Sequence, residues 1–121
     1  MNRWQFSKEV FVRDTVPVRY EKLSRQLTRI AQIMHDPAAT ENSRESLTEA
    51  MVFIEWIAPD VGLDWQVELL ELQRLLARWK HQWETLQSDY PRRQVLAEEA
   101  LDWANRTAKI SEVLQFIKEV A

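Results

Sequence analysis

Cysteine is absent from the 121-residue sequence, and glycine occurs only once, at Gly62. Without cysteine the chain has no disulfide scaffold, no thiolate ligand for zinc or an iron–sulfur cluster, and no thiol nucleophile. With one glycine it has no glycine-rich phosphate loop, and it lacks the regular turn residues that sheet sandwiches and barrels need. These absences favour a helical fold without a thiolate-bound metal.

Long apolar runs are also missing. The longest, Met51 to Ile54, is far too short to span a membrane, and the first residues lack the basic-then-apolar order of an export signal. Hydrophobic residues make up 45% of the chain and charged residues 29%, with a formal net charge of −3, which is typical of a folded domain rather than a disordered chain. We therefore expect one domain over residues 1–121, located in the reducing cytoplasm and without a membrane span.

Apolar residues recur at alternating intervals of three and four in four segments, which is the spacing of amphipathic helices. We expect these helices over about residues 15–35, 43–58, 64–88 and 90–119. Asn42 with Glu45 is a candidate capping pair for the second helix, and Pro59 ends that helix. We call the row of apolar residues on the core-facing side of each predicted helix its seam. The seam of the third helix continues through Trp83 and Leu86, which predicts a straight helix to residue 88. Because the connections are short, the predicted fold class is all-α, an antiparallel four-helix bundle.

Residues 1–13 do not share this helical spacing. Trp4 and Phe6 alternate with polar residues as a strand would, whereas the segment from Ser7 to Val12 also fits a helical turn, so the conformation stays open. In either conformation, exposing these aromatic side chains and Phe11 would cost about 25 cal/mol per Å² of apolar surface. We therefore expect an N-terminal apolar segment docked on the bundle.

The charges of the third and fourth predicted helices indicate how the two would pair. If they form a hairpin that turns near Ser88 and Asp89, opposed residues have numbers that sum to about 177. This register brings together three pairs of opposite charge: Glu68 with Lys109, Glu71 with Arg106, and Arg78 with Glu99. Exposed pairs contribute only about 0.2–1 kcal/mol each, so we expect them to set the register more than the stability.

Two carboxylate motifs lie on the same two helices, Glu68-Leu-Leu-Glu71 and Glu99-Ala-Leu-Asp102. The pair resembles the metal-binding motifs of the all-α nucleotide pyrophosphohydrolases (MazG-like), and the string from Ala97 to Asp102 is similar to the second motif of that family. The resemblance implies a Mg²⁺-dependent hydrolase of nucleoside triphosphates in which Glu68, Glu71, Glu99 and Asp102 hold the ion. In the register above, the centres of the two motifs lie about 10 Å apart along the helix axis. They would align only if the third helix ended near residue 81, which would lower the sum to about 170.

Basic side chains form a stripe on the first predicted helix, and this basic stripe consists of Arg19, Lys22, Arg25 and Arg29. Arg92 and Arg93 form a second basic cluster at the start of the fourth predicted helix. The stripe could bind nucleic acid or an acidic partner, although the net charge of −3 and the pI of about 5.4 oppose nucleic acid. Residues 1–35 carry a net charge of +4 and residues 36–64 one of −6, so pairing within the chain is the simpler interpretation.

The two histidines, His35 and His81, give no sign of a metal site. Neither has a glutamate three residues before it, so the Glu-x-x-His signature of di-iron bundles is missing. We expect surface or helix-end roles for both, and no cofactor.

The end of the second helix and the start of the third carry more apolar residues than one buried stripe requires. These residues form a predicted interaction patch of Phe53, Trp56, Ile57, Leu63, Val67 and Leu70. Three covers are possible: the N-terminal segment with Val10 and Phe11, a second copy in a two-fold dimer, or a different protein. The chain also has six tryptophans, which are common in cores and at interfaces. We therefore expect a non-catalytic protein–protein interaction module, with the hydrolase and the nucleic-acid binder as alternatives.

Overall fold

The computed structural model of the chain describes residues 3–39 and 43–120, and the side chains of residues 3–6 lie outside that description. All regular structure in these ranges is helical, which confirms the all-α prediction. The elements are α1 (Arg3–Phe11), α2 (Val16–His35), α3 (Arg44–Ile57), the short 3₁₀ helix η2 (Ala58–Asp60), α4 (Leu63–His81), α5 (Trp83–Gln87) and α6 (Tyr90–Val120). Within the same ranges, none of these helices has both the length and the apolar character needed to cross a membrane.

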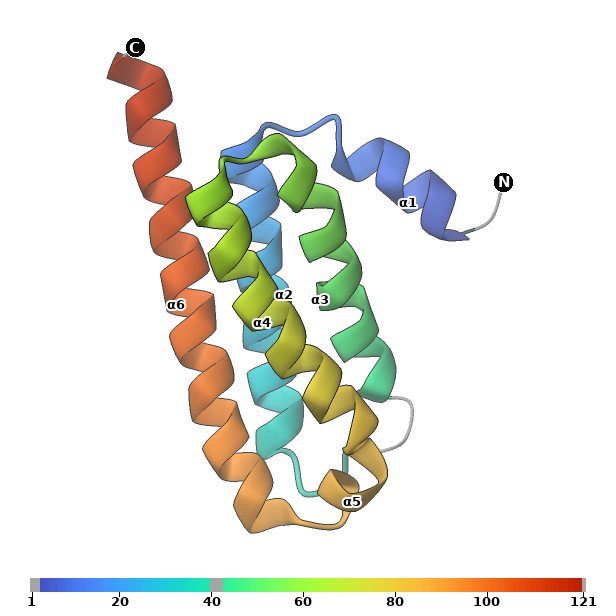
Figure 1. Cartoon of the computed structure of the whole chain (residues 1–121). Coiled ribbons are helices and arrows are strands. Elements are labelled where there is room, and N and C mark those ends of the chain that lie inside the picture. Colours follow the sequence, from blue (N-terminus) through green and yellow to red (C-terminus); the bar gives the residue numbers. More distant parts are fainter. Residues whose placement is uncertain (1–2, 40–42, 121) are drawn as a thin grey trace.

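Four long helices make up the body of the molecule (Figure 1). α2 packs against both α3 and α6, and α3 packs against α4. α1 projects from one side of this body, and the C-terminal end of α6 extends beyond it (Figure 1). The helices therefore share one core, while two helical ends stand away from it.

Small side chains bring α2 and α6 close together, since the distance between packed helices depends on the residues at the contact. The small residues of α6 on this side are Ala97, Ala100, Ala104, Thr107 and Ser111. Ser24 Oγ donates to the Ala104 carbonyl at 2.7 Å, and Ser111 Oγ donates to the Pro17 carbonyl at 2.6 Å. In both contacts the residue numbers sum to 128, which fixes the register of this antiparallel pair.

The seams predicted from sequence form most of the core. The fully buried side chains include Tyr20, Leu23, Leu27, Met34, Leu47, Ile57, Leu72 and Leu76, together with Trp79 and Trp83. The apolar residues of the last helix are buried in the core only as far as Ile110, and Ile117 is 50% exposed. The core therefore ends well before α6 does.

Most predicted helix bounds lie within one or two residues of those observed, which is the usual spread of helix ends. α3 ends at Ile57 and Pro59 lies in η2, as its missing N–H group requires. The proposed capping role of Asn42 lies outside the described residues.

The third predicted helix ends earlier than expected. α4 stops at His81, and after Gln82 the separate helix α5 begins. Trp83 and Leu86 are buried as predicted, but they reach the core from α5. Gln82 has φ −91° and ψ 8°, a sparsely populated conformation that interrupts the helix. The prediction of a straight helix to residue 88 is therefore wrong.

The predicted register of α4 along α6 is also wrong. Glu68 pairs with Arg106 and not with Lys109, so the sum is 174 instead of 177. Lys109 lies 3.8 Å from Glu112 on its own helix, and within the described ranges no ion pair joins Glu71 to Arg106 or Arg78 to Glu99. The predicted register assumed a straight helix to residue 88, whereas α4 ends at His81 and α5 follows it in the chain. In addition, the small side chains of α6 face α2 rather than α4.

The buried guanidinium of Arg93 holds the bend after α4 in place. Its Nη2 donates to the Asp36 carbonyl at 2.9 Å and its Nε to the Met34 carbonyl at 3.4 Å. Its Nη1 donates to the carbonyls of Leu86 and Gln87. These oxygens belong to the ends of α2 and α5, where backbone carbonyls have no partner within the helix. A straight continuation of α4 would carry the second pair away from Arg93.

Arg93→Met is expected to lower the free energy of unfolding by about 2–4 kcal/mol, because it leaves buried carbonyls without a donor. The matched control is Arg92→Met, which changes an exposed neighbour and should stay within about 0.5 kcal/mol of wild type. Urea denaturation followed by circular dichroism measures both. Equal stabilities of the two variants would show that Arg93 does not support the bend.

Candidate functional site

The predicted interaction patch divides into a covered half and an exposed half. Phe53 and Trp56 are partly buried against the core, and Ile57 is fully buried. The other three residues lie on the outer face of α4, spaced by four and three so that they share one side of the helix. We call them the α4 stripe: Leu63 is 73% exposed, Val67 55% and Leu70 49%.

The covered half lies under the end of α1. Phe11 is only 3% exposed, and its ring stacks on that of Phe53 with centroids 4.6 Å apart. The ring of Trp56 lies 5.5 Å from that of Phe11. Val10 is partly in water, and the side chains of Trp4 and Phe6 lie outside the described residues. Among the side chains that the structure describes, Phe11 is the aromatic residue with which the N-terminal segment covers this half of the patch.

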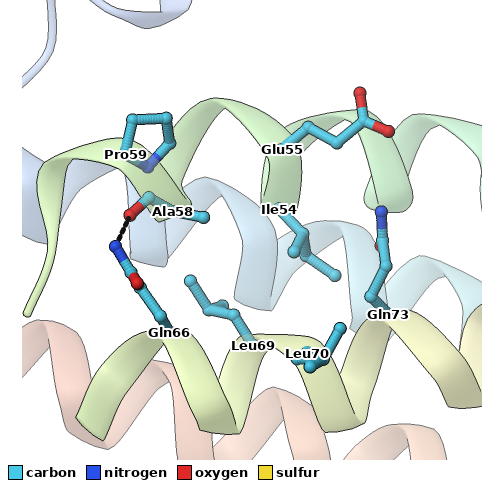
Figure 2. Close-up of a pocket in the computed structure, with 8 residues that line it drawn as sticks. All are labelled: Ile54, Glu55, Ala58, Pro59, Gln66, Leu69, Leu70 and Gln73. Carbon is cyan, nitrogen blue, oxygen red and sulfur yellow. Dashed lines mark hydrogen bonds between the residues drawn. The ribbon is translucent and has the colours of Figure 1, made fainter. Parts of the chain in front are cut away.

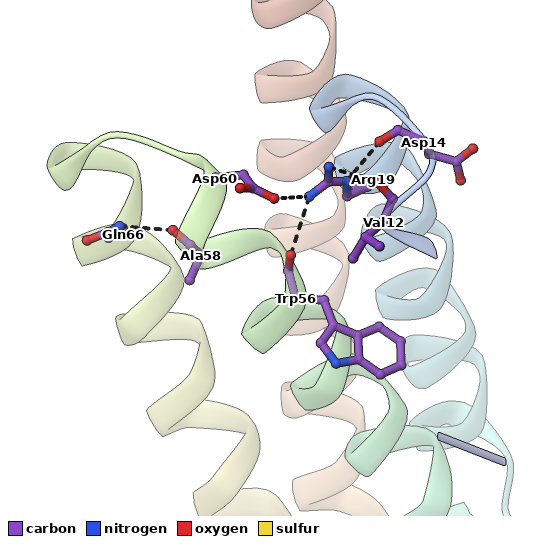
Figure 3. Close-up of polar contacts among 7 residues, drawn as sticks. All are labelled: Val12, Asp14, Arg19, Trp56, Ala58, Asp60 and Gln66. Atoms are coloured by element: carbon purple, nitrogen blue, oxygen red, sulfur yellow. Dashed lines mark hydrogen bonds and ion pairs between the residues drawn. The ribbon is translucent and has the colours of Figure 1, made fainter. Parts of the chain in front are cut away.

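Arg19 fastens the loop after α1 to the end of α3 (Figure 3). Its Nε donates to the Asp14 carbonyl at 2.9 Å, and its Nη1 lies 2.7 Å from Asp60 Oδ2. It also donates to the carbonyls of Trp56 at 3.4 Å and Val12 at 3.3 Å. Arg19 is therefore buried and bound within the chain. Its contact with Asp60 joins the basic first part of the sequence to the acidic second part.

The rest of the basic stripe is mostly paired as well. Lys22 forms an ion pair with Asp14, and Arg25 pairs with Glu21 at 2.8 Å. Arg29 is exposed. Together with the burial of Arg93, these pairs leave little continuous basic surface for a phosphate backbone.

A groove of about 400 Å³ runs between α3 and α4 (Figure 2). Its floor is apolar and includes Ile54 and Leu69, and Leu70 of the α4 stripe lies at its edge. Two glutamines of α4 bridge the helices: Gln66 Nε2 donates to the Ala58 carbonyl at 2.9 Å, and Gln73 Nε2 to the Met51 carbonyl at 3.2 Å. The groove therefore continues the exposed apolar surface toward α3.

A second apolar surface lies on the free end of α6, which the sequence analysis missed. We call residues 113–120 the α6 overhang, and its exposed apolar residues are Val113, Phe116, Ile117 and Val120. A signal for it exists in the sequence, because the last predicted helix is about nine residues longer than the first. A helix that is longer than its neighbours has an end without a partner.

The four carboxylates implied as metal ligands do not converge. Glu68 binds Arg106, whose guanidinium lies 3.8 Å from the ring centroid of Trp103. α4 does end at His81, as alignment of the two motifs requires. The Glu68–Arg106 pair, however, gives a sum of residue numbers of 174, whereas the motifs would align at a sum of about 170. In the part of the chain that the structure describes, no three His, Asp or Glu side chains are placed to hold a metal ion. His35 and His81 are both exposed at helix ends.

Tyr20 is a fully buried phenol whose hydroxyl has no hydrogen-bond partner among the described residues. Burial raises the pKa of Tyr20 from 10.0 to about 12, and the negative charge of Glu68 adds to this shift. The neutral hydroxyl therefore persists through the physiological range.

Comparison with protein-family models, with curated proteins and with solved structures gives no match for this chain. The function must therefore be inferred from the molecule itself. Its two distinctive surfaces are the α4 stripe and the α6 overhang, which expose large apolar side chains on two helices.

Tyr20→Phe is expected to be neutral or to stabilise the fold by up to about 1 kcal/mol at pH 7, because it removes a buried hydroxyl without a partner. Above pH 10 the unfolded state loses the Tyr20 proton while the folded state keeps it until about pH 12. Wild type should therefore lose about 2 kcal/mol relative to Tyr20→Phe by pH 11.5.

Urea denaturation of both proteins at pH 7 and at several values from 9 to 11.5 measures the effect. Tyr90→Phe serves as the control, since the Tyr90 hydroxyl donates to the His35 carbonyl at 2.9 Å and its loss should destabilise the fold at pH 7. Parallel pH profiles for wild type and Tyr20→Phe would contradict the raised pKa.

Proposed function

We propose that this protein is a non-catalytic interaction module that binds another protein chain through its apolar end. The observation that carries the proposal is the α4 stripe, where three large apolar side chains lie in water on a helix whose opposite face is buried. Exposed apolar patches of this kind are typical of protein–protein contact sites. The adjoining groove between α3 and α4 extends the same surface.

The architecture that we propose for this module is an antiparallel four-helix bundle of α2, α3, α4 and α6. Directly beneath the α4 stripe, Leu69, Leu72 and Leu76 are buried in the core, so the binding face rests on a well-packed support. A rigid helix face loses little conformational freedom on binding, which favours affinity. We place the module in the cytoplasm because it has no cysteine to pair in an oxidising compartment.

The two alternative functions have less support. Nucleic-acid binding would use the basic stripe, but Arg19 is buried and Lys22 and Arg25 are bound to carboxylates. Triphosphate hydrolysis would use the four carboxylates, but Glu68 is bound to Arg106. The apolar surface, in contrast, has no counterpart within the described chain.

The double variant Val67→Lys/Leu70→Lys is expected to lose the protein partner while keeping its fold. Both side chains are about half exposed, so the free energy of unfolding should change by no more than about 0.5 kcal/mol. Each lysine would bury a charge at the interface, which the complex cannot compensate. The measurement combines the mass of the purified chain by light scattering with the stoichiometry of proteins that co-purify from the source cells.

The matched control is Val95→Lys, which changes an exposed apolar residue of α6 far from the stripe and should leave binding intact. If wild type is monomeric and carries no stoichiometric partner, or if the double variant keeps the wild-type partner, the α4 stripe is not a binding surface.

A further inference from the structure

The α6 overhang exists because the register of α2 and α6 carries the end of α6 beyond the first residue of α2. The contacts Ser24–Ala104 and Pro17–Ser111 both give a sum of 128. Val16, the first residue of α2, therefore lies opposite Glu112. The eight residues from 113 to 120 continue beyond α2 by about 12 Å, at 1.5 Å per residue. Figure 1 shows this end of α6 standing free of the body.

The apolar residues of the overhang share one side of the helix. Their positions, 113, 116, 117 and 120, repeat at intervals of three and four. Phe116 is 63% exposed and Val120 66%. Leu114 packs partly against the core, but two helical turns with few tertiary contacts are marginal in water, so this segment gains stability from any partner that covers it.

We propose that the partner is a second copy of this chain, in a two-fold arrangement in which the α6 overhang of each copy lies across the α4 stripe of the other. The proposal rests on the function proposed above and names its partner. One molecule carries both a protruding apolar helix end and an exposed apolar helix face. A two-fold axis covers both surfaces on both copies at once, as a closed dimer requires.

The area of these surfaces fits a dimer. The seven exposed side chains of the stripe and the overhang leave roughly 600–700 Å² of apolar surface in water, which is close to the about 800 Å² that each partner buries in a standard specific interface. The overhang carries Lys118 and Glu119 and so has no net charge to oppose this contact.

The mass of the purified protein in solution tests the proposal. Sedimentation equilibrium is expected to give twice the 14.4 kDa mass of the chain. Phe116→Ser/Ile117→Ser should raise the dimer dissociation constant at least about 30-fold, because it removes two large apolar contacts. Both residues are exposed, so folding should be unaffected. The matched control, Val95→Ser/Leu101→Ser, changes exposed apolar residues in the part of α6 that α2 already covers and should stay dimeric.

Disulfide cross-linking tests the arrangement of the two copies, since the natural chain has no cysteine. In the register set by Glu68 and Arg106, Ile117 lies about ten residues, or roughly 15 Å, beyond the point opposite Val67. A disulfide requires Cα atoms within about 7 Å, so these positions cannot be joined within one chain. Mixed and oxidised, Val67→Cys and Ile117→Cys chains are expected to form the mixed dimer in preference to either homodimer.

The outcomes separate this inference from the proposed function. A monomer at millimolar concentration overturns the self-association, whether or not the chain captures a different protein through the stripe. Loss of that capture in Val67→Lys/Leu70→Lys would then keep the proposed function. A dimer that survives Phe116→Ser/Ile117→Ser, or that gives only self-linked products with the cysteine variants, also overturns the arrangement.

Discussion

The close packing of α2 against α6 is the constraint on which the rest of the structure depends. Small side chains, among them Ala100 and Ala104, allow the two helices to approach, and hydrogen bonds from Ser24 and Ser111 lock their register. That register sets where Arg93 meets the end of α2, and therefore where α5 must turn. The same register makes α6 extend beyond α2. The α6 overhang at one end of the molecule and the bend between α4 and α5 at the other therefore have the same origin.

Two buried guanidiniums, those of Arg93 and Arg19, bind backbone carbonyls at the two ends of the helical body. Arg93 binds carbonyls at the ends of α2 and α5, while Arg19 binds the loop after α1 and reaches Asp60 beyond α3. An arginine suits this role because its planar fork donates several hydrogen bonds in fixed directions. Both residues look like surface charges in the sequence. Their burial removes both residues from any phosphate-binding surface.

The local features of the fold could be predicted from the sequence, and the long-range ones could not. The spacing of Leu69, Leu72 and Leu76 indicates a buried helix face because periodicity is a property of neighbouring residues. The helix that packs against α6 could not be predicted in this way, since no residue near position 100 indicates that the alanines of α6 face α2 rather than α4. The end of α4 at His81 has no proline or glycine to mark it, and the side chain that binds the following helix α5, Arg93, lies twelve residues further along the chain. The predicted patch divides into two halves for the same reason, because burial depends on residues that are distant in sequence. Phe53 is covered by Phe11, whereas Leu63 is exposed.

The difference between the two ends of α6 bears on why its apolar residues extend to Val120. Up to Ile110 the apolar residues of α6 that face the core, such as Leu96 and Ala100, are buried and contribute to the stability of the single chain, while Val95 and Leu101 are exposed. Beyond that point Phe116, Ile117 and Val120 are at least half exposed and contribute less to the folding of one copy, whereas Leu114 still packs against the core. Burial of such surface yields about 25 cal/mol per Å², and here that free energy becomes available only on association. Arg106 and Lys109 show that charged residues fit the exposed side of α6, so an apolar face on its last two turns is not a consequence of helix formation. The self-association that we propose accounts for this apolar face.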